Sequence, residues 1–113
     1  MVTSTLDRTF AALSDPTRRH ILRCLAEGEA TVGELAEPLP ISRPAVSKHL
    51  RVLENAGLVR RLPDGRMSRC LLDPTPLRAA WDWVSEYRQL WEHQLRALAH
   101  YLEPHGNSES ETR

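Results

Sequence analysis

The 113-residue chain has only two cysteines, Cys24 and Cys70, and they lie far apart in the sequence. This spacing predicts neither a disulfide framework nor a structural zinc site built on paired cysteines. No apolar run approaches the 18 residues that a membrane-spanning helix needs, and the first residues do not resemble a secretory signal. A cytoplasmic protein without membrane contact is therefore expected.

The side-chain groupings typical of enzymes are also missing from the sequence. There is no nucleophile paired with a base, no glycine-rich phosphate loop and no complete set of metal ligands. The histidines are scattered, and His93 and His100 fall on the polar stripe of the last predicted helix. Neither enzymatic activity nor a cofactor is expected, and the two cysteines are expected to pack as small apolar residues. Whether these histidines and cysteines take part in sensing stays open.

The formal net charge is zero, so the overall charge does not point to a polyanionic partner. Between residues 43 and 69, however, seven cationic side chains are accompanied by only two carboxylates, a local net charge of +5. A basic patch on a neutral protein directs an anion to one face. An ordinary solvated surface has the same composition, and charge alone does not decide between the two.

The first half of the chain carries clear signals for helix ends. Apolar spacing predicts a short helix over about 5–13 and a second helix that runs to about Glu27 and stops at Gly28. Asp15 is a suitable N-cap for the second helix, and Pro16 fits its first position, where a missing N–H costs nothing.

A third and a fourth helix follow closely on each other. Thr31 and Glu34 have the spacing of a capping box at the start of a brief third helix, which two prolines close. Ser42 is the predicted N-cap of the fourth helix, and Gly57 ends it. Two short helices joined by a tight turn are therefore expected between residues 31 and 57.

The fourth helix sorts into two faces at 100° per residue. Val46, Leu50 and Leu53 share the inward face, and His49 flanks it as an expected boundary residue. A helix that enters the major groove needs short side chains near its N-terminus, and hydroxyl and cationic groups for base edges and phosphates. An amphipathic helix with a merely solvated polar side is the alternative. The candidate DNA-contacting residues of this helix are Ser42, Arg43, Pro44, Ser47, Lys48 and Arg51.

Two strand-like runs, 58–62 and 67–72, come next, and the Asp-Gly pair between them predicts a tight hairpin. Four arginines surround the turn. Arg66 and Arg69 are the candidate contacts to phosphates or to an adjacent minor groove. Of the two neighbouring arginines in the first run, one is expected to point away from DNA.

The longest predicted element is a single helix over about 77–103, which contains all three tryptophans. Its apolar face is wider than a small head can cover, so part is expected to pack on its own domain and part on a second copy. Arg88 interrupts the apolar row; an ion pair across the dimer, a register-setting polar position and a snorkelling stem are open alternatives. The candidate dimerisation residues are Leu77, Trp81, Val84, Trp91, Leu95 and Leu98.

Taken in order, these motifs resemble the ArsR/SmtB family of bacterial winged helix-turn-helix regulators over roughly residues 6–75. The resemblance rests on the segments 11–22, 32–36, 42–53, 56–59 and 65–66. It implies a mainly α winged helix-turn-helix fold of about five helices and a two-stranded wing, dimeric through its terminal helices. It also implies binding to a palindromic double-stranded DNA operator and repression of the protein's own operon, with release by a metal or another inducer. By position, the recognition helix carries Ser42, Arg43, Ser47, Lys48 and Arg51, and the wing carries Arg66.

The chain departs from the metal-sensing branches of that family. One branch places a Cys-x-Cys pair in the third helix just after Glu-Leu, whereas Ala36 and Glu37 follow here. Another branch uses Asp-x-His with a downstream His-x-x-Glu; residues 100–103 match the second half, but Tyr87 and Gln89 occupy the first. No metal site is predicted. A subgroup without metal ligands is more similar, and the inducer stays unidentified.

These observations lead to one DNA-binding and dimerisation domain over residues 1–104 and a disordered tail over 105–113. The leading hypothesis is a sequence-specific transcriptional regulator, an operon repressor that binds its operator as a homodimer. The alternative is a winged-helix protein-interaction module without DNA binding. The cationic outward face of the fourth helix argues against the alternative.

Overall fold

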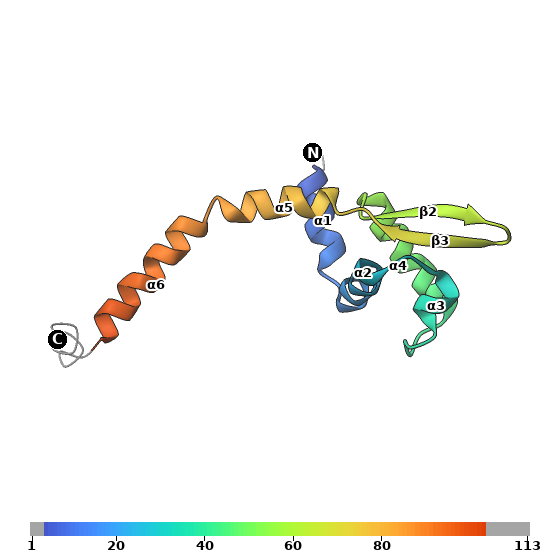
Figure 1. The fold of residues 1–113 in the computed structure, drawn as a ribbon, viewed down its shortest axis with the longest axis horizontal. Coiled ribbons are helices and arrows are strands. Elements are labelled where there is room, and N and C mark those ends of the chain that lie inside the picture. Colours follow the sequence, from blue (N-terminus) through green and yellow to red (C-terminus); the bar gives the residue numbers. More distant parts are fainter. Residues whose placement is uncertain (1–3, 104–113) are drawn as a thin grey trace. The chain divides into compact units, whose positions relative to one another are not determined.

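The structure, a computed structural model, describes residues 4–103 (Figure 1). It divides into two compact units, Met1–Ala80 and Trp81–Arg113. The first unit holds the first four helices, the strands and the start of a fifth helix, and the described part of the second unit is mostly helical. The tail predicted to be disordered, 105–113, lies outside the described residues.

Capping side chains set where the helices of the first unit begin. Oxygens of Asp15, Thr31 and Ser42 accept hydrogen bonds from backbone N–H groups three residues further on, at 3.0, 3.2 and 3.3 Å. Each satisfies an N–H that the first helical turn leaves without a partner. All three predicted caps are confirmed. The helices are α1 (Thr5–Leu13), α2 (Pro16–Glu27), α3 (Val32–Ala36) and α4 (Arg43–Asn55).

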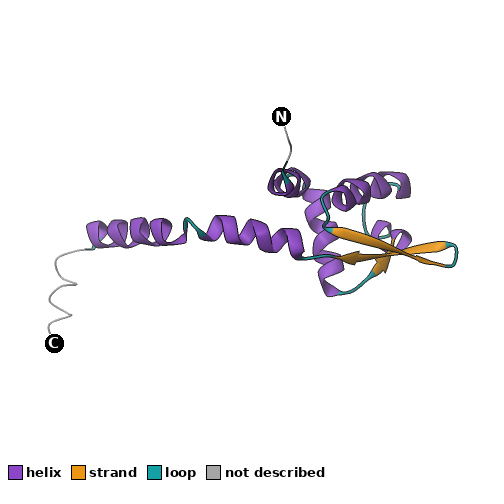
Figure 2. Cartoon of the chain, turned by 90° about the horizontal axis from the view of Figure 1, so that it is seen from above, coloured by secondary structure: helices purple, strands orange, loops and turns teal. Residues whose placement is uncertain are grey.

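Three antiparallel strands form the sheet: β1 (Ala30–Thr31), β2 (Val59–Asp64) and β3 (Met67–Leu72), in the order β1-β3-β2 (Figure 2). The long β2–β3 hairpin is the expected wing. The sequence did not predict β1, because two residues are too few to show a periodicity. By pairing Thr31 with Arg69, β1 places the start of α3 beside the middle of the wing.

The turn of the wing is tighter than the sequence suggested. Asp64 still pairs with Met67 in the ladder, so the loop consists of Gly65 and Arg66 alone. Gly65 has φ +63°, the left-handed conformation that a type II′ hairpin turn needs at its first central position. The consequence is that Arg66 belongs to the turn itself, at the tip of the hairpin.

The core of the first unit lies between α2, α4 and the sheet. The inward face predicted for α4, with Leu50 at its centre, is confirmed, and Ile21 on α2 and Cys70 on β3 are fully buried with it. Leu58 joins the same cluster just before β2. This packing holds α4 by one face and leaves its opposite face outward.

The Thr31–Glu34 capping box makes stability sensitive to acid. The Glu34 carboxylate accepts hydrogen bonds from the Thr31 N–H at 2.8 Å and the Thr31 hydroxyl at 3.2 Å. These bonds favour the ionised form and hold the pKa of Glu34 below the ordinary value of 4.5. Since the folded-state pKa is the lower one, this stabilisation is present above the ordinary value and is lost as the pH falls through the folded-state pKa.

Glu34→Gln is therefore expected to flatten the acid side of the stability profile. Glutamine keeps an oxygen for the Thr31 N–H but does not titrate, so the variant loses less stability between about pH 5 and pH 3 than the parent does. Thermal unfolding midpoints measured across that range give the comparison. Parallel profiles for the two proteins would contradict the role assigned to Glu34.

The predicted single helix over 77–103 is wrong, because the segment forms two helices, α5 (Thr75–Ser85) and α6 (Arg88–Leu102). At the break, the N–H groups of Glu86 and Tyr87 bond to carbonyls only three residues back, at 3.2 and 3.0 Å. Aromatic and β-branched residues around the break are weaker helix formers, and Trp83 packs edge-on against Tyr87 with ring centroids 5.2 Å apart. Residues 4–103 thus contain six helices rather than about five.

None of the helices between residues 4 and 103 is long and apolar enough to cross a lipid bilayer.

Candidate nucleic-acid interface

The outward face of α4 carries most of the predicted contact residues. Opposite the fully buried Val46, Leu50 and Leu53, the side chains of Lys48 and Arg51 are exposed. Near the N-terminus of the helix, Ser47 is half-buried. The remaining predicted residues at this end are also exposed; they are Ser42, Arg43 and Pro44.

The helix that precedes α4 packs against it through Leu35 and Ala36, which are buried. A six-residue connection, 37–42, joins the two. A short helix, a short connection and a second helix with one outward polar face form a helix-turn-helix, in which the second helix reads the major groove. Here α4 occupies that position.

A groove of about 540 Å³ separates α3 and the start of α4 from the wing. Its cationic and hydroxyl-bearing lining residues come from both sides: Arg43 and Ser47 from α4, Arg66 and Ser68 from the hairpin. Glu34 and Glu37 line it on the α3 side. The groove is therefore of mixed charge, with its cations nearest the recognition helix and the wing tip.

Two wing arginines are engaged by carboxylates. Arg69 Nε lies 3.0 Å from Glu29 and 3.6 Å from Asp64, so its charge is partly neutralised within the protein. Arg61 Nε lies 2.9 Å from Glu54 on α4. Arg61 is thus the strand arginine that points back toward α4, whereas Arg60 is exposed. A DNA contact by Arg69 stays a prediction. A DNA phosphate would have to compete with the Glu29 and Asp64 carboxylates for its guanidinium.

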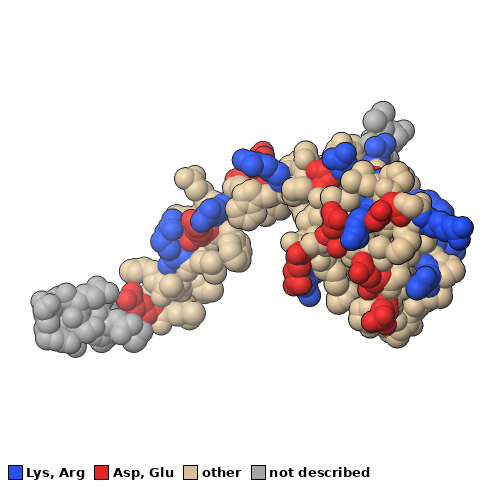
Figure 3. Space-filling model, turned by 45° about the vertical axis from the view of Figure 1, so that its right-hand side comes forward, with Lys and Arg blue, Asp and Glu red and all other residues tan. Residues whose placement is uncertain are grey.

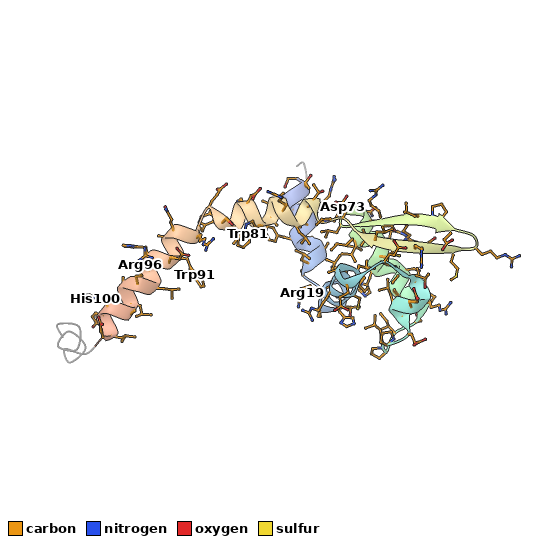
Figure 4. All side chains as sticks on the ribbon, in the orientation of Figure 1. Arg19, Asp73, Trp81, Trp91, Arg96 and His100 are labelled. Atoms are coloured by element: carbon orange, nitrogen blue, oxygen red, sulfur yellow. The ribbon has the colours of Figure 1, made fainter. Side chains whose placement is uncertain are left out.

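His49 lies at the boundary of the core, as predicted. Its Nδ1 is 3.8 Å from Asp15 and 3.4 Å from an Arg18 guanidinium nitrogen. Arg18 also donates to the carbonyl of Ala12 at 2.7 Å. The neighbouring Arg19, which is labelled in Figure 4, donates to the carbonyl of Leu13 at 2.7 Å. Sequence reasoning missed this link between the end of α1 and α4, because nothing in the local pattern marks it.

Acidic and basic side chains are mixed over the face of the first unit seen in Figure 3, with Lys and Arg gathered toward one edge. Because the whole chain has a formal net charge of zero, the excess of cations over residues 43–69 is local to that segment.

Within residues 4–103, the cysteines and histidines do not form a cluster of ligands. Cys70 is fully buried, and burial raises the pKa of its thiol. Cys24 Sγ lies 3.6 Å from His20 on the same helix, and His100 lies 3.8 Å from Glu103. Between residues 4 and 103, no three His, Cys, Asp or Glu side chains are grouped so that they could hold a metal ion.

The second unit exposes a broad apolar face. Trp81 is 60% exposed and Trp91 is 64% exposed, and a cavity of about 610 Å³ lies between them at the bend. In Figure 4, Trp91 and Arg96 project from opposite sides of α6. Arg88 forms an ion pair with Glu92 one turn along, at 3.0 Å. The other exposed members of the predicted set are Val84, Leu95 and Leu98.

Leu77 differs from the rest of that set. It lies in the first unit, where it is half-buried and packs against the core cluster. Leu77 therefore packs within its own unit, and the dimer contact predicted for it stays a prediction.

Comparison with known proteins agrees with this geometry. Residues 15–61 match the family model described as bacterial regulatory protein, arsR family. The HTH-type transcriptional regulator Rv2034 of Mycobacterium tuberculosis is 44% identical over 101 residues, which cover 89% of this chain and 92% of that protein. The transcriptional repressor SdpR of Bacillus subtilis is 35% identical over 82 residues, 73% of this chain and 91% of that protein.

A solved structure shares the fold. The crystal structure of an ArsR family transcriptional regulator, RHA00566, superposes with a TM-score of 0.73 and 40% identity, covering 79% of this chain and 98% of that one. Together with the outward face of α4 and the wing, these matches establish the winged helix-turn-helix and a regulatory role in transcription. The chain belongs to the ArsR family of bacterial transcriptional regulators.

Proposed function

We propose that this regulator is a repressor, acting in the bacterial cytoplasm, that binds a palindromic operator as a homodimer, with residues 1–104 serving as one DNA-binding and dimerisation domain. The observation that carries the proposal is the outward face of α4, where Lys48 and Arg51 are exposed opposite a fully buried apolar face. Exposed cations on a recognition helix serve base edges and phosphates. In a dimer, two such helices would enter major grooves about one helical turn apart.

Titration of labelled DNA from upstream of the protein's own gene tests the proposal. The parent protein should bind this DNA more tightly than a duplex of the same length and composition with scrambled sequence. Equal affinity for the two duplexes would contradict the proposal that the protein binds this site sequence-specifically. No detectable binding to either would favour the protein-interaction alternative.

Arg66→Ala is expected to weaken binding to every DNA sequence by a similar factor. Because Arg66 lies in the two-residue turn at the wing tip and is exposed, we expect it to contact phosphate and not a particular base. Loss of one phosphate contact lowers the slope of log K against log salt by about 1. Affinities measured over a range of salt give this slope, and identical slopes for variant and parent would exclude the contact.

The exposed apolar face of the second unit is proposed to form the dimer interface. Static light scattering at micromolar concentration should give twice the 12.9 kDa mass of the chain. Trp91→Glu places a charge in that face and should shift the mass toward the monomer. Arg96→Glu, on the opposite side of α6, is the matched control and should leave the dimer intact. A monomeric parent, or equal effects of both variants, would contradict this interface.

A further inference from the structure

The side chain of Arg43, the first residue of α4, turns back across α3. An ideal Cβ built on Gly33 would lie 2.9 Å from Arg43 Nη2 and 3.1 Å from Cζ. Real Cβ atoms are not found that close to another group, so the guanidinium occupies space that any other residue at position 33 would fill. The placement of the Arg43 side chain therefore depends on the absence of a Cβ at Gly33, which lies on the preceding helix.

Gly33 is an unfavourable choice for the helix itself. It stands within α3, which is only five residues long, and it does not have a left-handed backbone. In a helix, glycine is less favourable than alanine because it loses more backbone freedom on folding. Neither a turn nor a positive φ accounts for the glycine here. With a Cβ at position 33, the end of the flexible Arg43 side chain would have to move away from α3.

The position over α3 is where a nucleic-acid backbone would pass. In a helix-turn-helix, the second helix lies in the major groove and the first crosses the sugar-phosphate backbone. A guanidinium folded onto α3 is thus turned away from base edges. Ser47, Arg66 and Ser68 line the same groove from its other sides, which adds hydroxyl and cationic donors suited to phosphate.

Arg43 also differs from the wing arginines in its freedom to bind. Arg61 and Arg69 are each within 3.0 Å of a carboxylate. Arg43 is exposed, and in the part of the chain that the structure describes its guanidinium is not among the groups joined in an ion pair. Two carboxylates, Glu34 and Glu37, line the same groove: Glu34 is held by Thr31 in the capping box, and among the described residues neither forms an ion pair with Arg43. The Arg43 charge is therefore available to an outside anion.

We propose that Arg43 contacts the phosphodiester backbone of bound DNA from above α3, and that Gly33 is the positioning residue that makes room for it. This assignment rests on the proposed function. It separates Arg43 from Lys48 and Arg51, which are exposed on the outward face of α4 and are the residues expected to meet base edges.

A double-mutant cycle on the full chain tests the assignment. Arg43→Ala should weaken binding about tenfold, equally on operator and scrambled duplex, and lower the salt slope by about 1. Gly33→Ala should weaken binding by roughly threefold to tenfold while its thermal unfolding midpoint stays equal to or above that of the parent, because alanine favours the helix. In the Arg43→Ala background, Gly33→Ala should have no further effect on affinity.

The outcomes separate this assignment from the proposed function. Parent-like binding by Gly33→Ala, or an equal loss with and without Arg43, would overturn the positioning role. A loss by Arg43→Ala that is confined to the operator would show a base contact and would overturn the phosphate assignment. A parent protein without affinity for DNA would overturn the proposed function, and this assignment with it.

Discussion

Replacing Lys48 and Arg51 together with alanine is expected to weaken operator binding by about 2–6 kcal/mol. Each base-reading cation is worth about 1–3 kcal/mol, and both side chains are exposed on the outward face of α4. Fluorescence anisotropy with labelled operator measures the loss. The preference for operator over scrambled duplex should fall as well, because contacts to base edges carry the sequence information.

Arg23→Ala is a suitable control for this double variant. Arg23 is also an exposed arginine on a helix of the first unit, but it lies on α2 and not on the recognition helix. The Arg23→Ala variant should lower the affinity for DNA only through the small change in net charge. Parent-like affinity of the Lys48 and Arg51 double variant, or an equal loss in the control, would show that the outward face of α4 is not the DNA-reading surface.

Leu50→Ala is expected to lower the free energy of unfolding by about 2–5 kcal/mol. Leu50 is completely buried at the centre of the inward face of α4, so its truncation loses apolar burial and leaves a cavity. For a small domain this is a large share of the total stability. Urea denaturation followed by far-ultraviolet circular dichroism measures the change.

Val52→Ala provides the matched control on the same helix. Val52 is an apolar residue two positions further on, but it is 39% exposed. Alanine is also the better helix former, so the net change should be under about 1 kcal/mol. If the two variants lost equal stability, the inward face of α4 would not be the part of the helix that anchors it.

Several local elements follow from short-range chemistry, which is why they could be predicted from the sequence. The caps at Asp15, Thr31 and Ser42 need only an oxygen and an N–H three residues away. The two faces of α4 follow from the 3.6-residue period. Contacts between residues within one helical turn of each other can be predicted directly from the amino-acid sequence.

Other features depend on partners far away in the sequence. Arg69 could not be distinguished from Arg66 by type or spacing, yet it meets Glu29, forty residues earlier, and Asp64 across the strands. The bend between α5 and α6 also escaped prediction. No glycine or proline marks it, and an apolar row interrupted only by Arg88 suggested one helix.

The sequence by itself determined the order of the first four helices and the hairpin, and the face of α4 that is available to DNA, because these depend on local periodicity and capping. Its motifs, taken together, carried the resemblance to the family. The tertiary structure alone decided which cations remain available. Side chains as long as arginine reach groups that sequence distance does not reveal, as when Arg61 meets Glu54 and Arg43 lies over Gly33. The charge of a residue is local information, but its freedom to bind is a property of the folded chain.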